Sequence, residues 1–162
     1  MQQEIVGQTL IARGETITSA ESLTAGLFVS TLAEVSGISA VLPGAFVTYA
    51  ASAKTQLVGV SPALIDQDGV VSQSVAMAMA QGAKETLQTD WAISFTGVAG
   101  PMALEGHPAG TVFIGLAAPD GTVTAQQYQF VGDRQTIRLA SVQAGFALIM
   151  AKIADLPTLE KK

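Results

Sequence analysis

The sequence predicts a three-layer α/β/α sandwich whose mixed sheet includes an antiparallel hairpin. Segments with apolar residues at helical spacing alternate with short apolar runs typical of buried strands, which indicates helices packed on a sheet. Two strand-like segments flank Pro119-Asp120-Gly121, a hairpin turn signal, so the sheet is not wholly parallel. The chain has 162 residues, of which 49% are hydrophobic and 13% charged. We therefore expect residues 1–162 to form a single domain with a substantial core.

The first third of the chain predicts two helices and a strand. Gly14 and Gly37 are the residues at which each helix is expected to end, because glycine is a common helix stop. The elements are expected, in order, as a helix over 2–13, a strand over 16–20, a turn over 21–26 and a helix from Leu27 to Gly37.

The remaining elements follow the same logic. Ser61-Pro62 opens a helical turn, with serine as cap and proline at the first helical position. The expected elements are a buried strand over 45–49, a helix over 51–57, a helix over 72–87, strands over 91–95, 111–117 and 122–130, and a helix over 133–153. Apolar stripes should be buried on the two long helices at Val75, Met79, Ala83 and Leu87, and at Val142, Phe146, Ile149 and Ile153.

Composition excludes several classes of function. A net charge of −5 with only eight Lys and Arg residues argues against nucleic-acid binding, which depends on basic residues. No apolar run reaches the roughly 20 residues of a membrane span, and the amino terminus lacks the form of a signal peptide. We therefore expect a cytoplasmic protein without membrane contact. The absence of cysteine and the single histidine, His107, favour a site without metal, and the Ala- and Met-rich helices favour a homo-oligomer.

Ligands of open α/β sheets bind beyond the carboxyl ends of the strands, which selects residues 20–26, 49–54 and 96–101. In the first segment, a turn and a helix start follow Ser22, and backbone N–H groups there can bind an anion or stabilise an oxyanion. The alternative is that Ser22 or Thr24 is only a helix cap. The segment matches neither a P-loop nor a G-x-S-x-G elbow.

Lys54, five residues after Tyr49, is a candidate general base, although most lysines are solvated surface groups. Lowering a lysine pKa from about 10.4 to about 7 by burial costs about 4–5 kcal/mol. Glu21 would oppose that shift, so its carboxylate is expected to point elsewhere. Tyr49 is either core packing or a hydroxyl that bridges Ser22 and Lys54.

The glycine-rich segment 94–101 permits close backbone approach, so a ligand can rest on it, or it is a structural turn. His107 is expected to be exposed rather than catalytic. Arg134 and Arg138 follow one another at helical spacing, and Arg138 continues a buried stripe. A buried arginine requires an anion. Its partner is either a carboxylate such as Asp133 or a bound phosphate, which a guanidinium binds in bidentate fashion.

Five motifs occur in one order: TSAESLTAG, GAFVTYAASAK, SFTGVAGP, PAGTVFIGL and FVGDRQTIR. Together, over about residues 4–152, they resemble the CinA carboxy-terminal family. The resemblance implies an amidohydrolase that converts nicotinamide mononucleotide to nicotinic acid mononucleotide and ammonia without metal or organic cofactor. Ser22 would be the nucleophile, Lys54 its base and Tyr49 an aid to proton transfer or orientation. The phosphorylated nucleotide would be bound by residues of the two loops and the last helix: Thr24, Ala25, Gly26, Ser94, Thr96, Gly97, Arg134 and Arg138.

The residue types available in the chain agree with a serine nucleophile and a lysine base. Without cysteine or a second histidine, a Ser-Lys pair is nearly the only nucleophilic option in this sequence. The chain departs from the usual family pattern at Leu23, Ala25 and Ala51, and in the loop after Gly100-Pro101. The alternatives are a paralogue that binds a small phosphorylated nucleotide without this turnover, and a scaffold in which Ser22 and Lys54 lie far apart.

Overall fold

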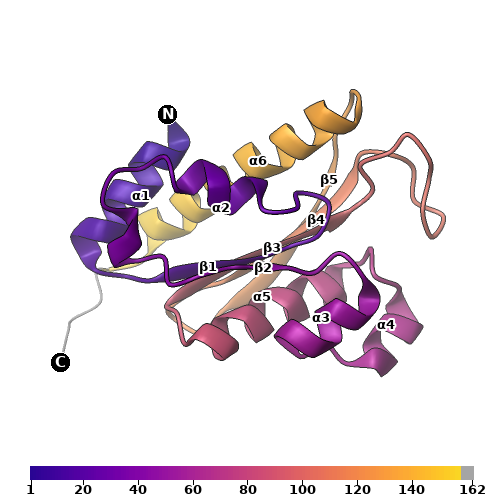
Figure 1. The fold of residues 1–162 in the computed structure, drawn as a ribbon, viewed down its shortest axis with the longest axis horizontal. Coiled ribbons are helices and arrows are strands. Elements are labelled where there is room, and N and C mark those ends of the chain that lie inside the picture. The colour runs from indigo at the N-terminus through magenta and orange to yellow at the C-terminus, as the bar shows by residue number, and fades with distance from the viewer. Residues whose placement is uncertain (158–162) are drawn as a thin grey trace.

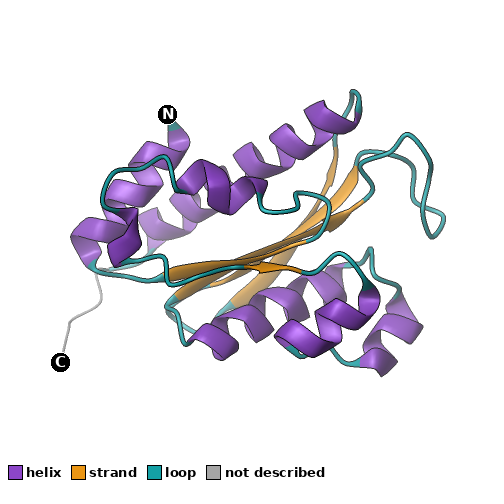
Figure 2. Cartoon of the chain, in the orientation of Figure 1, coloured by secondary structure: helices purple, strands orange, loops and turns teal. Residues whose placement is uncertain are grey.

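The computed structural model describes residues 1–157 and has three layers, with an open sheet between two layers of helices (Figure 1). Figure 2 shows that helices cover both faces of the sheet. One layer contains α1 (Gln2–Arg13), α2 (Leu27–Leu32) and α6 (Arg134–Asp155). The other contains α3 (Ala51–Val58), α4 (Pro62–Asp68) and α5 (Gln73–Leu87). The predicted α/β/α sandwich is confirmed.

The sheet has five strands in the order β2-β1-β3-β4-β5. They are β1 (Ile17–Glu21), β2 (Phe46–Val47), β3 (Trp91–Gly97), β4 (Thr111–Ala117) and β5 (Val123–Gln129). The pairs β1–β2 and β1–β3 are parallel, whereas β3–β4 and β4–β5 are antiparallel, so the predicted mixed sheet and hairpin are confirmed. Because β1, β2 and β3 run the same way, their carboxyl ends share one edge of the sheet.

Each face of the sheet has its own core. On the α6 side, Phe28 stacks on Phe146 with 4.6 Å between ring centroids and tilts against Phe95 at 5.5 Å. On the α5 side the core is built from small and medium residues, and the helix lies close to the strands. A Cβ on Gly115 would stand 2.3 Å from the carbonyl oxygen of Ala76, so this approach requires a glycine in β4.

Helix ends follow the signals in the sequence. Gly14 ends α1 in the left-handed conformation, with φ of 63°. The hydroxyls of Ser61 and Ser72 accept from the backbone N–H groups of Leu64 and Val75, and so cap α4 and α5. Both predicted apolar stripes are buried, apart from Leu87, which is half-buried.

Three expectations about elements are wrong in extent. The strand expected over 45–49 contains only Phe46–Val47, and Val47 is 48% exposed, because β2 is an edge strand paired only with β1. The helix expected to run to Gly37 ends at Leu32, and a short 3-10 turn, Ile38–Ala40, follows that glycine. The turn expected at Ser61-Pro62 is the start of a full helix, α4.

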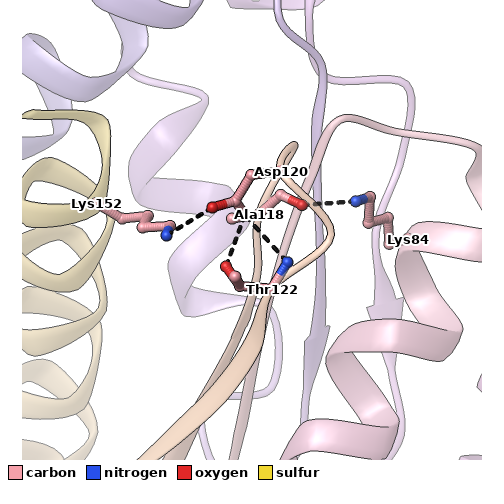
Figure 3. Close-up of polar contacts among 5 residues, drawn as sticks. All are labelled: Lys84, Ala118, Asp120, Thr122 and Lys152. Atoms are coloured by element: carbon pink, nitrogen blue, oxygen red, sulfur yellow. Dashed lines mark hydrogen bonds and ion pairs between the residues drawn. The ribbon is translucent and has the colours of Figure 1, made fainter. Parts of the chain in front are cut away.

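The β4–β5 turn is held by both helical layers (Figure 3). From α5, the Nζ of Lys84 donates to the carbonyl of Ala118 at 2.7 Å. From α6, the Nζ of Lys152 lies 2.9 Å from a carboxylate oxygen of Asp120, whose other oxygen accepts from the hydroxyl and N–H of Thr122. These bonds hold the pKa of Asp120 well below its usual range. The turn therefore ties the two helical layers to one end of the sheet.

By length and composition, α6 is the one helix in the described part of the chain that could span a membrane. Its apolar stripe is buried against the sheet at Val142, Phe146, Ile149 and Ile153. The hydropathy of α6 is thus explained by its place in the core.

Candidate functional site

A serine and a lysine meet at the carboxyl edge of the parallel strands. Ser22 directly follows β1, and Lys54 lies on α3, which is separated by three residues from the end of the neighbouring strand β2. The Nζ of Lys54 stands 3.3 Å from the Oγ of Ser22. The scaffold alternative, which required these side chains to lie far apart, is therefore wrong.

Lys54 is buried, with 1% of the residue exposed. Its Nζ also lies 2.6 Å from the carbonyl oxygen of Thr48 and 3.3 Å from that of Tyr49. Burial lowers the pKa of Lys54 from 10.5 to about 8, and the negative charge of Glu105 acts in the opposite direction. A neutral amine has two N–H donors for the two carbonyls and a lone pair for the hydroxyl proton of Ser22. The contacts therefore suit a base as well as an ammonium group.

Glu21 points away from Lys54, as predicted. Its carboxylate is buried and accepts from the hydroxyl of Ser19 at 2.9 Å and from the N–H groups of Phe28 at 2.9 Å and Val29 at 3.2 Å. The first turn of α2 is thus occupied by Glu21 and is not open to an anion or oxyanion, contrary to our expectation. The cap prediction is also wrong, because Gly26 is the N-cap of α2 and neither Ser22 nor Thr24 caps it.

Arg138 holds the turn that follows Ser22. Its Nε donates to the carbonyl of Leu23 at 2.8 Å and its Nη2 to the carbonyl of Thr24 at 3.0 Å. Within the described part of the protein the guanidinium is thus bound by backbone carbonyls and not by a carboxylate such as Asp133, and the phosphate alternative stays a prediction. A trans peptide points its N–H opposite to its carbonyl, so Arg138 also orients the N–H of Thr24. Within residues 1–157, the N–H groups of Leu23 and Thr24 have no acceptor. They are the candidate donors to an oxyanion.

Arg134, at the start of α6, joins Tyr49 to the glycine-rich loop. Its Nη2 donates to the Tyr49 hydroxyl at 2.8 Å, and its Nη1 donates to the carbonyl of Gly100 at 2.8 Å. Tyr49 is 55% exposed. Its carbonyl, not its hydroxyl, contacts Lys54, so the expected bridge between Ser22 and Lys54 is absent among the described contacts. Both side chains instead present polar atoms at the mouth of a cavity.

That cavity has a volume of about 420 Å³, within the range of about 300–1,000 Å³ typical of small-molecule sites. Its walls come from the serine turn, the segment before α5, the loop after β3 and the start of α6, namely Ser22, Leu23, Tyr49, Val70, Val71, 96–104 and Arg134. Hollows of about 660 Å³ beside α1 and α6 and of about 520 Å³ beside the start of α5 are larger. Neither is lined by Ser22, whereas the smaller cavity is, so chemistry rather than volume selects the smaller cavity.

The other predicted site residues separate into two groups. Thr96 and Gly97 line the cavity, and a Cβ on Gly97 would stand 2.6 Å from the carbonyl oxygen of Thr111. Ser94, Thr24, Ala25 and Gly26 do not line it. Ser94 is buried and donates to the carbonyl of Ala76. Thr24 is fully buried, and its hydroxyl has no partner within the described residues.

Ala25 and Gly26 form the turn into α2, with φ of 47° and 94°. His107 is half-buried rather than exposed, with its ring edge toward Phe113. In the described range, no cluster of three His, Cys, Asp or Glu residues could hold a metal ion.

Sequence reasoning missed two parts of the site. One is the apolar wall formed by Val70 and Val71, which precede α5. The other is Glu105, which acts on the charge of Lys54 from the loop after β3. Both lie outside the strand ends from which the site was predicted, and no spacing or motif distinguishes them.

Fold and site together define a three-layer α/β protein that holds a buried serine–lysine pair at the carboxyl edge of its parallel strands, with the serine lining a cavity. The chain belongs to the CinA C-terminal domain family, whose sequence profile matches residues 1–153.

Relatives in sequence and in structure agree with this membership. A competence-damage inducible protein of Lactiplantibacillus plantarum is 58% identical over 152 residues, which are 94% of this chain and 36% of the relative. A Levilactobacillus brevis relative with the same name is 60% identical over 141 residues, 87% of this chain and 34% of its own length. The chain thus spans about a third of the curated relatives it matches.

Two crystal structures match most of the chain. Competence damage-inducible protein A (ComA) of Klebsiella pneumoniae has a TM-score of 0.93 and 29% identity, and the match covers 96% of this chain and 97% of that one. A competence-damaged protein (CinA) superfamily protein of Escherichia coli has a TM-score of 0.88 and 32% identity, with coverages of 92% and 87%.

Proposed function

We propose that the chain is an amidohydrolase that deamidates nicotinamide mononucleotide to nicotinic acid mononucleotide and ammonia. The observation that carries the proposal is the 3.3 Å separation of Ser22 Oγ and a buried Lys54 Nζ with a lowered pKa. A serine becomes a nucleophile when an adjacent base takes its proton. The names of the relatives describe only competence-damage inducible proteins, so the substrate is inferred from the site and from the family resemblance.

In the first half of the reaction, neutral Lys54 takes the hydroxyl proton of Ser22 while Oγ attacks the carboxamide carbon. The carbonyl oxygen becomes an oxyanion, for which the free N–H groups of Leu23 and Thr24 are the candidate donors. The tetrahedral intermediate collapses as the protonated Lys54 gives its proton to the leaving ammonia. Water then attacks the acyl-serine by the same route, which releases the carboxylate and restores Ser22.

The cavity offers complementary groups for the rest of the nucleotide. Arg134, exposed at the rim, is the candidate for the phosphate, because a guanidinium matches phosphate geometry. Val70 and Val71 form an apolar wall against which a pyridine ring can lie. The proposal includes a cytoplasmic setting and no requirement for a metal or organic cofactor.

The test is ammonia release from nicotinamide mononucleotide by the purified chain. Ser22→Ala and Lys54→Ala should each lose nearly all turnover, since both proton transfer and attack pass through this pair. Ser52→Ala, an exposed serine on α3, is the matched control and should leave turnover unchanged. Undiminished turnover in both site variants would exclude the assigned mechanism.

A second candidate is a paralogue that binds a small phosphorylated nucleotide without hydrolysing it. One observation favours it: the first-turn N–H groups of α2 are occupied by Glu21, so only a short turn remains to stabilise an oxyanion. Calorimetric binding of nicotinamide mononucleotide without release of ammonia would establish this function. Loss of that binding in Arg134→Ala would place the ligand in the cavity.

A further inference from the structure

The loop over residues 98–110, which connects β3 to β4, projects beyond the sheet (Figure 1) and forms the outer wall of the cavity. Its tip is closed by paired backbone hydrogen bonds between Leu104 and His107. Glu105, at that tip, binds a different part of the chain. Its Oε1 accepts from the N–H of Val71 at 2.8 Å, and its Oε2 accepts from the N–H of Val70 at 3.1 Å.

These two bonds join the opposite walls of the cavity. Val70 and Val71 line one side, and Leu104, the neighbour of Glu105, lines the other. Val70 is also held from beneath, because its carbonyl accepts from the hydroxyl of Thr96 at 2.6 Å. The segment before α5 is thus fixed between β3 and the loop, and one carboxylate provides the outer contact.

The backbone is shaped to allow this contact. Glu105 has a φ of 51°, in the left-handed region that non-glycine residues seldom adopt. Opposite it, a Cβ on Gly69 would stand 2.6 Å from the Glu105 Oε2, so a larger residue at this position would displace the carboxylate. Glu105 adopts a backbone conformation that is unfavourable for a non-glycine residue, which indicates that the fold maintains its contact at a cost.

The same carboxylate acts electrostatically on the reactive amine. Its negative charge favours the ammonium form of Lys54, against the effect of burial. The ionisable groups on the helices packed against α3 are Asp66 and Asp68 on α4 and Lys84 and Glu85 on α5. Glu21 ends β1 beside Ser22, and Arg134 and Arg138 reach the site from α6. Of these acids, Glu21 is turned toward the start of α2, and Asp68 accepts from the hydroxyl of Ser74.

We propose that Glu105 is a positioning residue that holds the two walls of the cavity together and contributes a negative charge to the electrostatic field at Lys54. It acts through the backbone of Val70 and Val71 and through the field at Lys54, without touching the reacting atoms. The inference concerns the site of the proposed function, but its test does not use the proposed substrate, so either can fail alone.

The test is NMR on the full chain with lysine labelled at the ε-carbon, which follows the titration of Lys54 directly. Glu105→Gln keeps the shape of the side chain but removes its charge and one of its two acceptors. The Lys54 midpoint should fall below the wild-type value of about 8, because the ammonium loses a neighbouring negative charge. Amide hydrogen exchange should accelerate in the same variant at whichever of Val70 and Val71 loses its acceptor, since a hydrogen-bonded N–H is protected.

Two further variants make the result decisive. Glu4→Gln removes one charge from α1, on the opposite helical layer, and should change neither readout. Glu105→Ala removes both acceptors and should accelerate exchange at both valines. An unchanged or raised Lys54 midpoint in Glu105→Gln would overturn the proposal. Wild-type exchange rates at Val70 and Val71 in Glu105→Ala would overturn it as well.

Discussion

The amine of Lys54 stands 3.3 Å from the hydroxyl of Ser22, although 32 positions separate the two residues in the chain. The pairing of β1 with β2 creates this proximity, since it brings the ends of two parallel strands to one edge. Burial of the lysine then makes the contact chemically useful, because it lowers the pKa to about 8. Neither Ser22 nor Lys54 alone provides both a nucleophile and a base.

The pH dependence of ammonia release should report the titration of Lys54. Since the pKa is about 8, the neutral base is the minor form below that value, and its population rises about tenfold per pH unit. We expect kcat/KM for nicotinamide mononucleotide to rise through about pH 8 and then level off. Steady-state assays from about pH 6 to about pH 10 measure this. A profile without an inflection in that window would contradict Lys54 as the base.

Stability should depend on pH through the same group. The folded-state pKa of Lys54, about 8, lies below its unfolded value of 10.5. Between these two values the unfolded chain binds more protons, so the free energy of unfolding rises with pH across that window. The full gain is about 3 kcal/mol as an upper bound. Urea unfolding on either side of the window measures it.

Lys54→Met is the control for this effect, because it lacks the titrating amine and should show a smaller gain. The comparison removes contributions from other groups, including Tyr128, whose burial raises its pKa in both proteins. Equal pH dependence in the wild type and Lys54→Met would contradict the assigned shift.

Arg138→Met should lower kcat for nicotinamide mononucleotide. The guanidinium binds the carbonyl of Leu23 and so orients the N–H of Thr24, one of the two candidate oxyanion donors, and it does not line the cavity. Misplaced donors cost transition-state stabilisation more than substrate binding, so we expect kcat to fall about 10- to 100-fold with KM little changed. Arg13→Met, on α1, is the control. A raised KM with unchanged kcat would indicate a phosphate contact instead.

Arg134→Met should raise KM, since Arg134 lies at the cavity rim where we place the phosphate. Loss of a charged phosphate contact should raise KM for nicotinamide mononucleotide about tenfold or more. The unphosphorylated riboside provides the control, because its kcat/KM should be nearly the same in both proteins. Equal losses for both compounds would show that Arg134 acts on the fold of the site rather than on phosphate.

The sequence predicted most of the fold because its signals are local. Helix caps such as Ser72 and a hairpin turn at 119–121 depend on a few neighbouring residues. The expected extent of β2 was wrong because strand pairing decides it, and an edge strand with one neighbour can be two residues long.

The sequence predicted the site residues that follow strand ends, because the topology of the sheet places them. It did not predict the contacts in which a side chain binds backbone atoms. Ser22, Lys54 and Arg134 follow from the rule on strand ends and from the resemblance. The partner of Arg138 is a pair of carbonyls, and that of Glu105 is a pair of N–H groups. Nearly every residue has both a backbone carbonyl and a backbone N–H, so the sequence contains no signal for which of these groups a side chain will bind.

Glu21→Gln tests the part of the serine turn that supports α2. The carboxylate is fully buried and accepts from the N–H groups of Phe28 and Val29 and from the hydroxyl of Ser19. Glutamine offers one carbonyl oxygen and turns an amide donor toward donors, so at least one buried N–H loses its acceptor. We expect the free energy of unfolding to fall by about 2–4 kcal/mol.

Urea unfolding near neutral pH measures that loss. Glu34→Gln is the matched control, because Glu34 is exposed and its carboxylate has one contact of 3.4 Å, to the Gln3 amide. Its effect should stay within about 0.5 kcal/mol. If the two variants were equally stable, Glu21 would not be the residue that fixes the first turn of α2. The orientation of the Ser22 turn would then depend on Arg138 and on backbone bonds such as that from Ser22 N–H to the carbonyl of Phe95.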